Sequence, residues 1–194
     1  MVATFDVIFD NGGIDGAAAN QTDVDALGPP ALRFKNADDA TIDANDKLVV
    51  PGVGGTKYSM WKQILIKCSA ADGHTMNNVA VYSDGACAWT TAKVDVNVAL
   101  TFPVRTSTSD DAYELPAVDE EMDVNHSGVT GTASFFSKTS GEATDLDVSI
   151  NEVGNIINAV NETCNYVVLQ MKVDDTADPG DLSDEDGWFS YDEA

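Results

Sequence analysis

Apolar and polar residues alternate with a period of two along much of this chain, which is typical of β-strands with one buried face. In the stretch VDVNVALTF (94–102), Val94, Val96 and Val98 share one face with Leu100 and Phe102, whereas Asp95 and Asn97 lie on the other. Phe5, Val7 and Phe9 share a face in the same way. We expect further strands at ALRFK (31–35), KLVV (47–50), YSMWKQILIKC (58–68), NVAVYS (78–83), ASFFS (133–137), DLDVSI (145–150), YVVLQMKV (166–173) and WFSYD (188–192).

Glycine-containing turns separate these stretches, as in PGVGG (51–55), ADG (71–73) and DEDG (184–187). Many short strands with such turns predict an all-β fold, an antiparallel β-sandwich (jelly-roll or Ig-like) of about ten strands. We expect one domain over residues 1–194. Only NEVGNIINAV (151–160) has apolar residues at helical spacing, so the sequence predicts at most one short helix.

The net charge is the most informative feature of the composition. Ten Lys and Arg against 33 Asp and Glu give a net charge of −23, while hydrophobic residues make up 43% of the chain and can form a core. Such like charge destabilises a folded protein unless salt screens it, and at ~1 M salt the screening length falls to about 3 Å. The composition therefore indicates a halophilic protein, with neither nucleic acid nor anionic membranes as partners.

The sequence MVATFDVIFD (1–10) has acids where a signal peptide needs a basic region and an unbroken apolar core. No run approaches the ~20 apolar residues that span a bilayer. We therefore expect a protein made and kept in the host cytoplasm, or released from it by lysis. Cys68, Cys87 and Cys164 are odd in number and widely spaced, which predicts reduced, mostly buried thiols.

The sequence contains few candidate catalytic residues. His74 and His126 are the only histidines, no G-x-S-x-G motif occurs, and no phosphate-binding loop is recognisable. The spacing of Cys68, His74, Cys87 and His126 follows no zinc-site pattern. We therefore expect no enzyme, no catalytic residue and no cofactor or metal. Calcium is the alternative, through two acidic clusters for which a solvated halophilic surface is the favoured explanation: Asp38, Asp39, Asn45 and Asp46, and Asp174, Asp175, Asp178 and Asp181.

Aromatic residues suggest a second class of function. Tyr58, Trp61, Tyr82 and Trp89 could stack on sugars if they were exposed on a sheet, although such residues more commonly form cross-strand pairs. A carbohydrate-binding host-adhesion module is therefore an alternative. Carboxylate pairs for glycoside hydrolysis cannot be chosen among so many acids.

Three segments carry a resemblance: ALRFKNADDATIDANDKLVVPGVGGTKYSMWKQILIKC (31–68), NNVAVYSDG (77–85) and TADPGDLSDEDGWFSYDEA (176–194). Their L-R-F-K strand, Y-S-x-W-K strand, N-N-V-x-x-Y-x-D-G hairpin and Y-D-E ending resemble an uncharacterised family of virion structural proteins of tailed viruses, phage-like viruses of halophilic archaea included. The resemblance runs over most of residues 28–90 and again from about 148 to 194, while residues 103–144 have no counterpart. It implies a virion component, without catalytic residues.

These observations together predict a non-enzymatic virion structural protein of a halophilic tailed virus, capsid-associated as a decoration, turret or vertex protein, with a tail component as the alternative. Expected partners are copies of itself in a homo-oligomer and other virion proteins such as the major capsid protein. The interface candidates are Trp188, Phe189 and Tyr191. In a strand, Phe189 and Tyr191 share one face and should pack inward, which leaves Trp188 on the surface.

Overall fold

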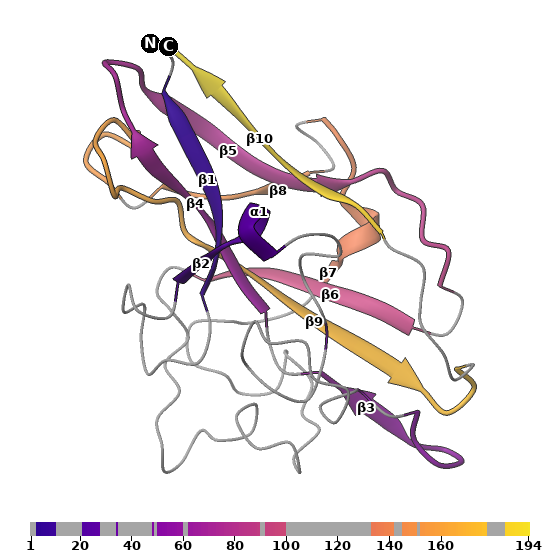
Figure 1. Ribbon diagram of the computed structural model, residues 1–194. Coiled ribbons are helices and arrows are strands. Elements are labelled where there is room, and N and C mark those ends of the chain that lie inside the picture. The colour runs from indigo at the N-terminus through magenta and orange to yellow at the C-terminus, as the bar shows by residue number, and fades with distance from the viewer. Residues whose placement is uncertain are drawn as a thin grey trace.

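The computed structural model describes residues 3–10, 21–27, 34, 48, 50–59, 62–89, 92–99, 133–141, 145–150, 152–177 and 185–194. These residues form ten strands, a short helix and a 3-10 turn (Figure 1). The elements are β1 (Thr4–Asp10), β2 (Gln21–Asp23), α1 (Val24–Leu27), β3 (Thr56–Tyr58), β4 (Lys62–Ala70), β5 (Met76–Ser83), β6 (Ala92–Ala99), β7 (Ala133–Ser134), η4 (Phe135–Ser137), β8 (Leu146–Asp147), β9 (Tyr166–Asp174) and β10 (Gly187–Glu193).

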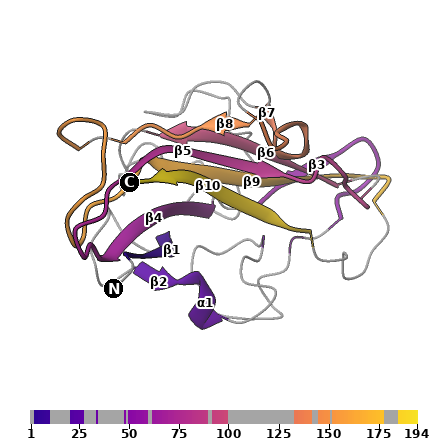
Figure 2. The same ribbon diagram turned by 90° about the horizontal axis from the view of Figure 1, so that it is seen from above.

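The strands make two antiparallel sheets, so the expected all-β fold is confirmed. The larger sheet has the order β2-β1-β4-β9-β6-β7, with β3 paired to the far end of β9, and the smaller has the order β10-β5-β8. Helix α1 follows β2 at one end of the larger sheet (Figure 2). Both sheets contribute to one hydrophobic cluster. The finer expectation, a jelly-roll or Ig-like sandwich, stays a prediction.

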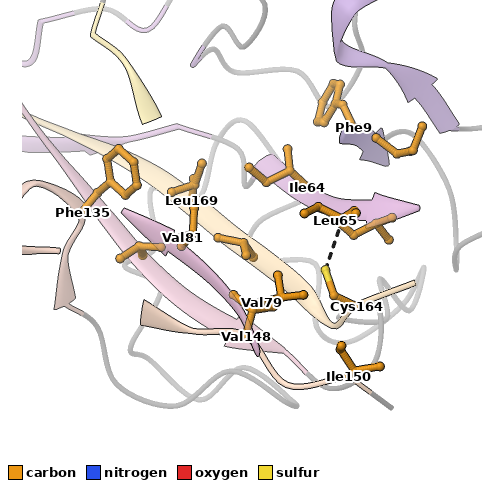
Figure 3. Packing of buried hydrophobic residues seen from close by; sticks show 14 of the residues in the cluster. Phe9, Ile64, Leu65, Val79, Val81, Phe135, Val148, Ile150, Cys164 and Leu169 are labelled. Atoms are coloured by element: carbon orange, nitrogen blue, oxygen red, sulfur yellow. Dashed lines mark hydrogen bonds between the residues drawn. The ribbon is translucent and has the colours of Figure 1, made fainter. Parts of the chain in front are cut away.

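The core faces of the strands are those that the alternation predicts. Phe9 of β1 lies opposite Ile64 of β4, which lies opposite Val167 of β9, and further along β9 Leu169 lies opposite Val96 of β6. This face of the larger sheet packs in one cluster with residues of the smaller sheet (Figure 3). The cluster includes Val79 and Val81 of β5, Val148 just after β8, and Phe135 of η4.

Both faces of β4 and β9 are buried, which corrects the expectation that β9 is a half-buried strand. Gln63 of β4, and Val168 and Gln170 of β9, are at most 1% exposed although they alternate with the core residues Ile64, Val167 and Leu169. Apolar residues outside the strands also pack against the core, among them Phe34, Leu48 and Val50. A central strand can therefore be buried on both faces, which alternation within the strand does not report.

The helix expected within residues 151–160 is wrong. Gly154 and Asn155 have φ angles of +84° and +58°, and such left-handed residues end helical hydrogen bonding. The segment instead makes a turn that exposes Val153 and buries Ile157, which forms a β-bridge to Met76.

Three strand expectations need correction in extent. The segment YSMWKQILIKC supplies the end of β3 and most of β4 rather than one strand, and ASFFS forms the two residues of β7 followed by η4. The NNVAVYSDG segment is not a hairpin, because β5 pairs with β10 and β8 and not with β6, the next strand along the chain. Of ALRFK and KLVV, the structure describes only Phe34, Leu48 and Val50, so those two strands lie outside the described residues.

Candidate interaction surface

Strand β10 is docked on the smaller sheet along its whole length. Trp188 lies opposite Tyr82, Phe189 opposite Val81 and Ser190 opposite Ala80. The pairing continues beyond the strand, because Thr75 N–H donates to the carbonyl oxygen of Ala194 at 2.8 Å and Ala194 N–H donates to that of Thr75 at 3.0 Å. The aromatic segment near residue 194 is thus held by its own chain.

The start of β10 requires glycine. A Cβ atom on Gly187 would lie 2.6 Å from Cζ of Phe135, which is buried in the core. The carboxylate of Glu185 accepts a hydrogen bond from Ala88 N–H at 2.8 Å, so the segment after β5 is tied to the start of β10. Glu185 and Gly187 therefore place the start of the strand over the ring of Phe135, a role that the sequence did not reveal.

A β-bulge in β5 shifts the register halfway along this pairing. Ser190 lies opposite Ala80 but Asp192 lies opposite Asn77, so β5 contains one extra residue between the two pairs. Asn78 lies within this interval and has a φ of +49°. Its side-chain amide donates to the carboxylate of Asp192 at 2.7 Å. Asn78 therefore both turns the backbone and fixes the last residues of β10.

Trp188 lies on the outer face of the smaller sheet, as expected, and is 40% exposed. Its ring stacks on that of Tyr82, with centroids 5.7 Å apart and planes inclined by 24°. Tyr82, one of the four candidate sugar-stacking residues, is thus part of a cross-strand pair that is also surface-exposed. Stacking across adjacent strands holds both rings in a defined position.

Phe189 packs inward against the core cluster, as predicted, but Tyr191 does so only in part. Tyr191 is 41% exposed, and its ring lies 5.4 Å from that of Phe5 on β1. It therefore contacts the larger sheet at the rim of the core. Alternation therefore assigned Tyr191 to the correct face, and only its degree of burial differs, since Tyr191 lies near the end of β10.

A shallow depression of about 150 Å³ lies between β5, β8 and the turn at Asn155. Its polar lining includes Asp147, Ser149 and Asn155, whose side chains make no hydrogen bond within the described part of the chain, together with Asn78. The sequence analysis did not identify these residues as a site. Asn155, for example, belongs to the segment that was expected to be helical.

The three cysteines are free, with Cys68 and Cys164 buried and Cys87 half-buried. Burial raises the pKa of Cys164 to about 12, and the backbone hydrogen bond from Ile66 opposes this only in part. The Sγ atom of Cys164 accepts from Ile66 N–H at 3.2 Å (Figure 3). Burial also raises the pKa of Cys68 and of Cys87. None of these thiols has the depressed pKa of a reactive cysteine.

Among the described residues, the candidate metal and catalytic residues are not brought together. His74 Nδ1 lies 3.2 Å from a carboxylate oxygen of Glu193, near the end of β10, while His126 lies outside the described residues. Asp175 accepts a hydrogen bond from Gly54 N–H. In the described ranges, no three His, Cys, Asp or Glu side chains form a group that could hold a metal ion. The remaining calcium candidates except Asp174 lie outside the description, namely Asp38, Asp39, Asn45, Asp46, Asp178 and Asp181.

The other sugar-stacking candidates occupy different places. Lys172 Nζ lies over the ring of Tyr58, 5.5 Å from its centroid. Trp89 packs against the core and meets Phe136 edge-on at 5.7 Å. Trp61 lies outside the described residues. Of the four candidates, Tyr82 is therefore the one that the described structure places beside an exposed aromatic ring.

Comparison with protein-family models, curated proteins and solved structures gives no match for this chain. None of the helices among the described residues has the length and apolar character that crossing a membrane requires.

Proposed function

We propose that this chain is a non-enzymatic structural protein of the virion of a halophilic tailed virus, associated with the capsid as a decoration, turret or vertex protein. The observation that carries the proposal is the C-terminal strand β10. It is fixed to its own sheet yet leaves Trp188 and Tyr191 about two-fifths exposed. Large aromatic residues held on an otherwise charged surface are typical anchors of protein interfaces.

The net charge of the chain supports an assembly role with protein partners. A net charge of −23 repels nucleic acid and anionic membranes, so contacts with protein are favoured. The resemblance of residues 31–68, 77–85 and 176–194 to tailed-virus structural proteins points the same way. The partners we propose are further copies of this chain and other virion proteins such as the major capsid protein. A tail component is the nearest variant.

Quantitative mass spectrometry of purified particles tests this role. The chain should sediment with intact particles in molar salt, in a fixed ratio to the major capsid protein, and should remain on tailless capsids. Recovery with isolated tails would overturn the capsid position in favour of a tail component. Recovery only in the soluble fraction of the lysate would overturn the virion role.

A carbohydrate-binding adhesion module is the second candidate, because the ring pair Tyr82 and Trp188 offers an exposed aromatic surface on the same sheet as the polar depression. Side chains with both donor and acceptor groups suit sugar hydroxyls. A screen of neutral glycans in molar salt tests this function. Binding that Trp188→Ala and Asp147→Ala both abolish would support it, whereas the absence of binding to any glycan would exclude it.

A further inference from the structure

Strand β10 is an edge strand of the smaller sheet, whose order is β10-β5-β8. In the part of the chain that the structure describes, its backbone pairs with β5 alone, and five of its seven residues are exposed. The edge facing away from β5 therefore carries unpaired N–H and C=O groups, which can template another strand. The usual protections are missing in its middle, since residues 188–191 contain neither proline nor a charged side chain.

We propose that β10 pairs with β10 of a second copy of this chain, antiparallel, about a two-fold axis at Ser190. The two smaller sheets then join into one continuous sheet. This inference deepens the proposed assembly role and rests on it, because it names the partner and the register of the contact.

The acidic residues favour the antiparallel direction. With Ser190 opposite Ser190, Asp192 lies opposite Trp188 of the second copy and Glu193 opposite its Gly187, so no two carboxylates face each other. A parallel, in-register pairing would place Asp192 opposite Asp192 and Glu193 opposite Glu193. Like charges directly opposite one another in a sheet are destabilising. The acidic residues of β10 thus disfavour parallel pairing, and the choice of Ser190 as the centre rests on the aromatic residues.

The aromatic residues fit the same register. Phe189 lies opposite Tyr191 of the second copy, and both belong to the face that packs toward the larger sheet, where Tyr191 is 41% exposed. Pairing would cover part of that exposed surface on each copy. Trp188 lies on the other face, beside Asp192 of the second copy, and stays stacked on Tyr82. A two-fold contact uses the same patch on both copies, as a self-complementary edge requires.

Salt controls this association, because two chains that each carry a net charge of −23 repel one another at long range. Main-chain hydrogen bonds and aromatic contacts act at short range and survive screening. We therefore expect the protein to be monomeric in dilute buffer and dimeric in ~2 M salt, where the screening length is a few Å.

Cysteine cross-linking of the full chain tests the two-fold axis. In a Cys87→Ser background, which removes the half-buried thiol, Ser190→Cys should form a disulfide-linked dimer under mild oxidation in molar KCl. Ser149→Cys is the matched control. Ser149 is an exposed serine that follows β8, the strand at the other edge of the same sheet. It should remain monomeric. Equal cross-linking of both variants, or sedimentation of the unmodified chain as a monomer at every salt concentration, would overturn the proposal.

A mixing experiment tests the strand direction. Trp188→Cys and Asp192→Cys chains, made with different mass labels, should cross-link to each other and not to themselves. Self-linking of Asp192→Cys would indicate parallel pairing and overturn the register. In addition, Ser190→Asp should weaken the dimer roughly two- to fivefold, since it sets two carboxylates opposite each other. If these tests fail while particles contain the protein, only the pairing is refuted; if particles lack it while the links form, only the virion role is refuted.

Discussion

Trp188 stacks on Tyr82, the residue directly opposite it on β5, with ring centroids 5.7 Å apart. The contact fixes the orientation of Trp188 while leaving 40% of the residue exposed. An anchor that is already ordered loses less side-chain entropy when a partner covers it. This relationship makes Trp188 better suited to a protein contact than a freely rotating surface aromatic would be.

Replacing Trp188 should therefore separate assembly from folding. We expect Trp188→Ala to lower the free energy of unfolding by only about 1 kcal/mol, the usual worth of an aromatic pair, and to weaken self-association in molar salt. Urea denaturation and sedimentation velocity measure the two effects. The matched control is Val153→Ala, because Val153 is 96% exposed and lies outside β10. Normal assembly of Trp188→Ala would place the contact elsewhere.

Asn78 should tolerate glycine better than alanine. Its φ of +49° disfavours alanine by about 1 kcal/mol, whereas glycine adopts this conformation freely. Both replacements remove the hydrogen bond to Asp192. Urea denaturation should therefore find Asn78→Ala less stable than Asn78→Gly, the reverse of the order within ordinary strands. Equal stabilities would mean that the bulge relaxes when the side chain is lost.

Two buried glutamines should respond in opposite ways to removal of their amides. Gln63 is 0% exposed, and neither side-chain amide atom has a hydrogen-bond partner among the residues that the structure describes. Gln170 is also buried, but its amide donates to the carbonyl oxygen of Ser59 at 3.1 Å. Gln63→Met should stabilise the protein by about 1 kcal/mol, since it removes an unsatisfied polar group, and Gln170→Met should destabilise it by a similar amount. Destabilisation by Gln63→Met would show that its amide is satisfied in solution.

These glutamines also show what the sequence could not predict about the fold. Alternation identified the core face of β9 through Val167 and Leu169, because each strand carries that pattern within itself. Burial of Gln63 and Gln170 depends instead on what covers the second face of the sheet. The pairing of β5 with β10, more than 100 residues later in the chain, depends on tertiary packing in the same way.

The interaction surface was predictable to a similar degree. The cluster of Trp188, Phe189 and Tyr191 indicated a docked strand and assigned the faces of Trp188 and Phe189 correctly. The 41% exposure of Tyr191 was not predictable, because it depends on tertiary packing against Phe5 of β1. The sequence signal for the bulge was the pair Asn77 and Asn78 near the start of β5, since asparagine is common in left-handed positions.

Cys164 should make stability fall at alkaline pH. Burial raises its pKa in the folded protein from 9.0 to about 12, so the folded state keeps the neutral thiol while the unfolded chain ionises. The contribution is complete below pH ~9 and declines by up to about 1.4 kcal/mol per pH unit as the pH rises toward 12. Urea denaturation between pH 8 and 11 should give a steeper decline for the native chain than for Cys164→Ala. Parallel declines would mean that Cys164 ionises equally in both states.

The strongest dependence of stability should be on salt. At a net charge of −23, repulsion among the carboxylates opposes folding, and salt screens this repulsion. The melting temperature should therefore climb steeply between roughly 0.1 and 2 M KCl. The double variant Asp147→Asn and Asp186→Asn, which neutralises two exposed acids, should be more stable than the native chain at low salt and equal to it at high salt.

Calcium provides the control that separates screening from specific binding. Millimolar calcium should raise the melting temperature no more than KCl of matched ionic strength if the acids act only through their collective field. A larger effect of calcium would indicate a discrete site, because a ligand that binds only the folded state stabilises it by mass action at concentrations far too low to screen charge. A melting temperature independent of KCl would contradict the halophilic interpretation itself, because folding would then be unaffected by the repulsion that the composition imposes.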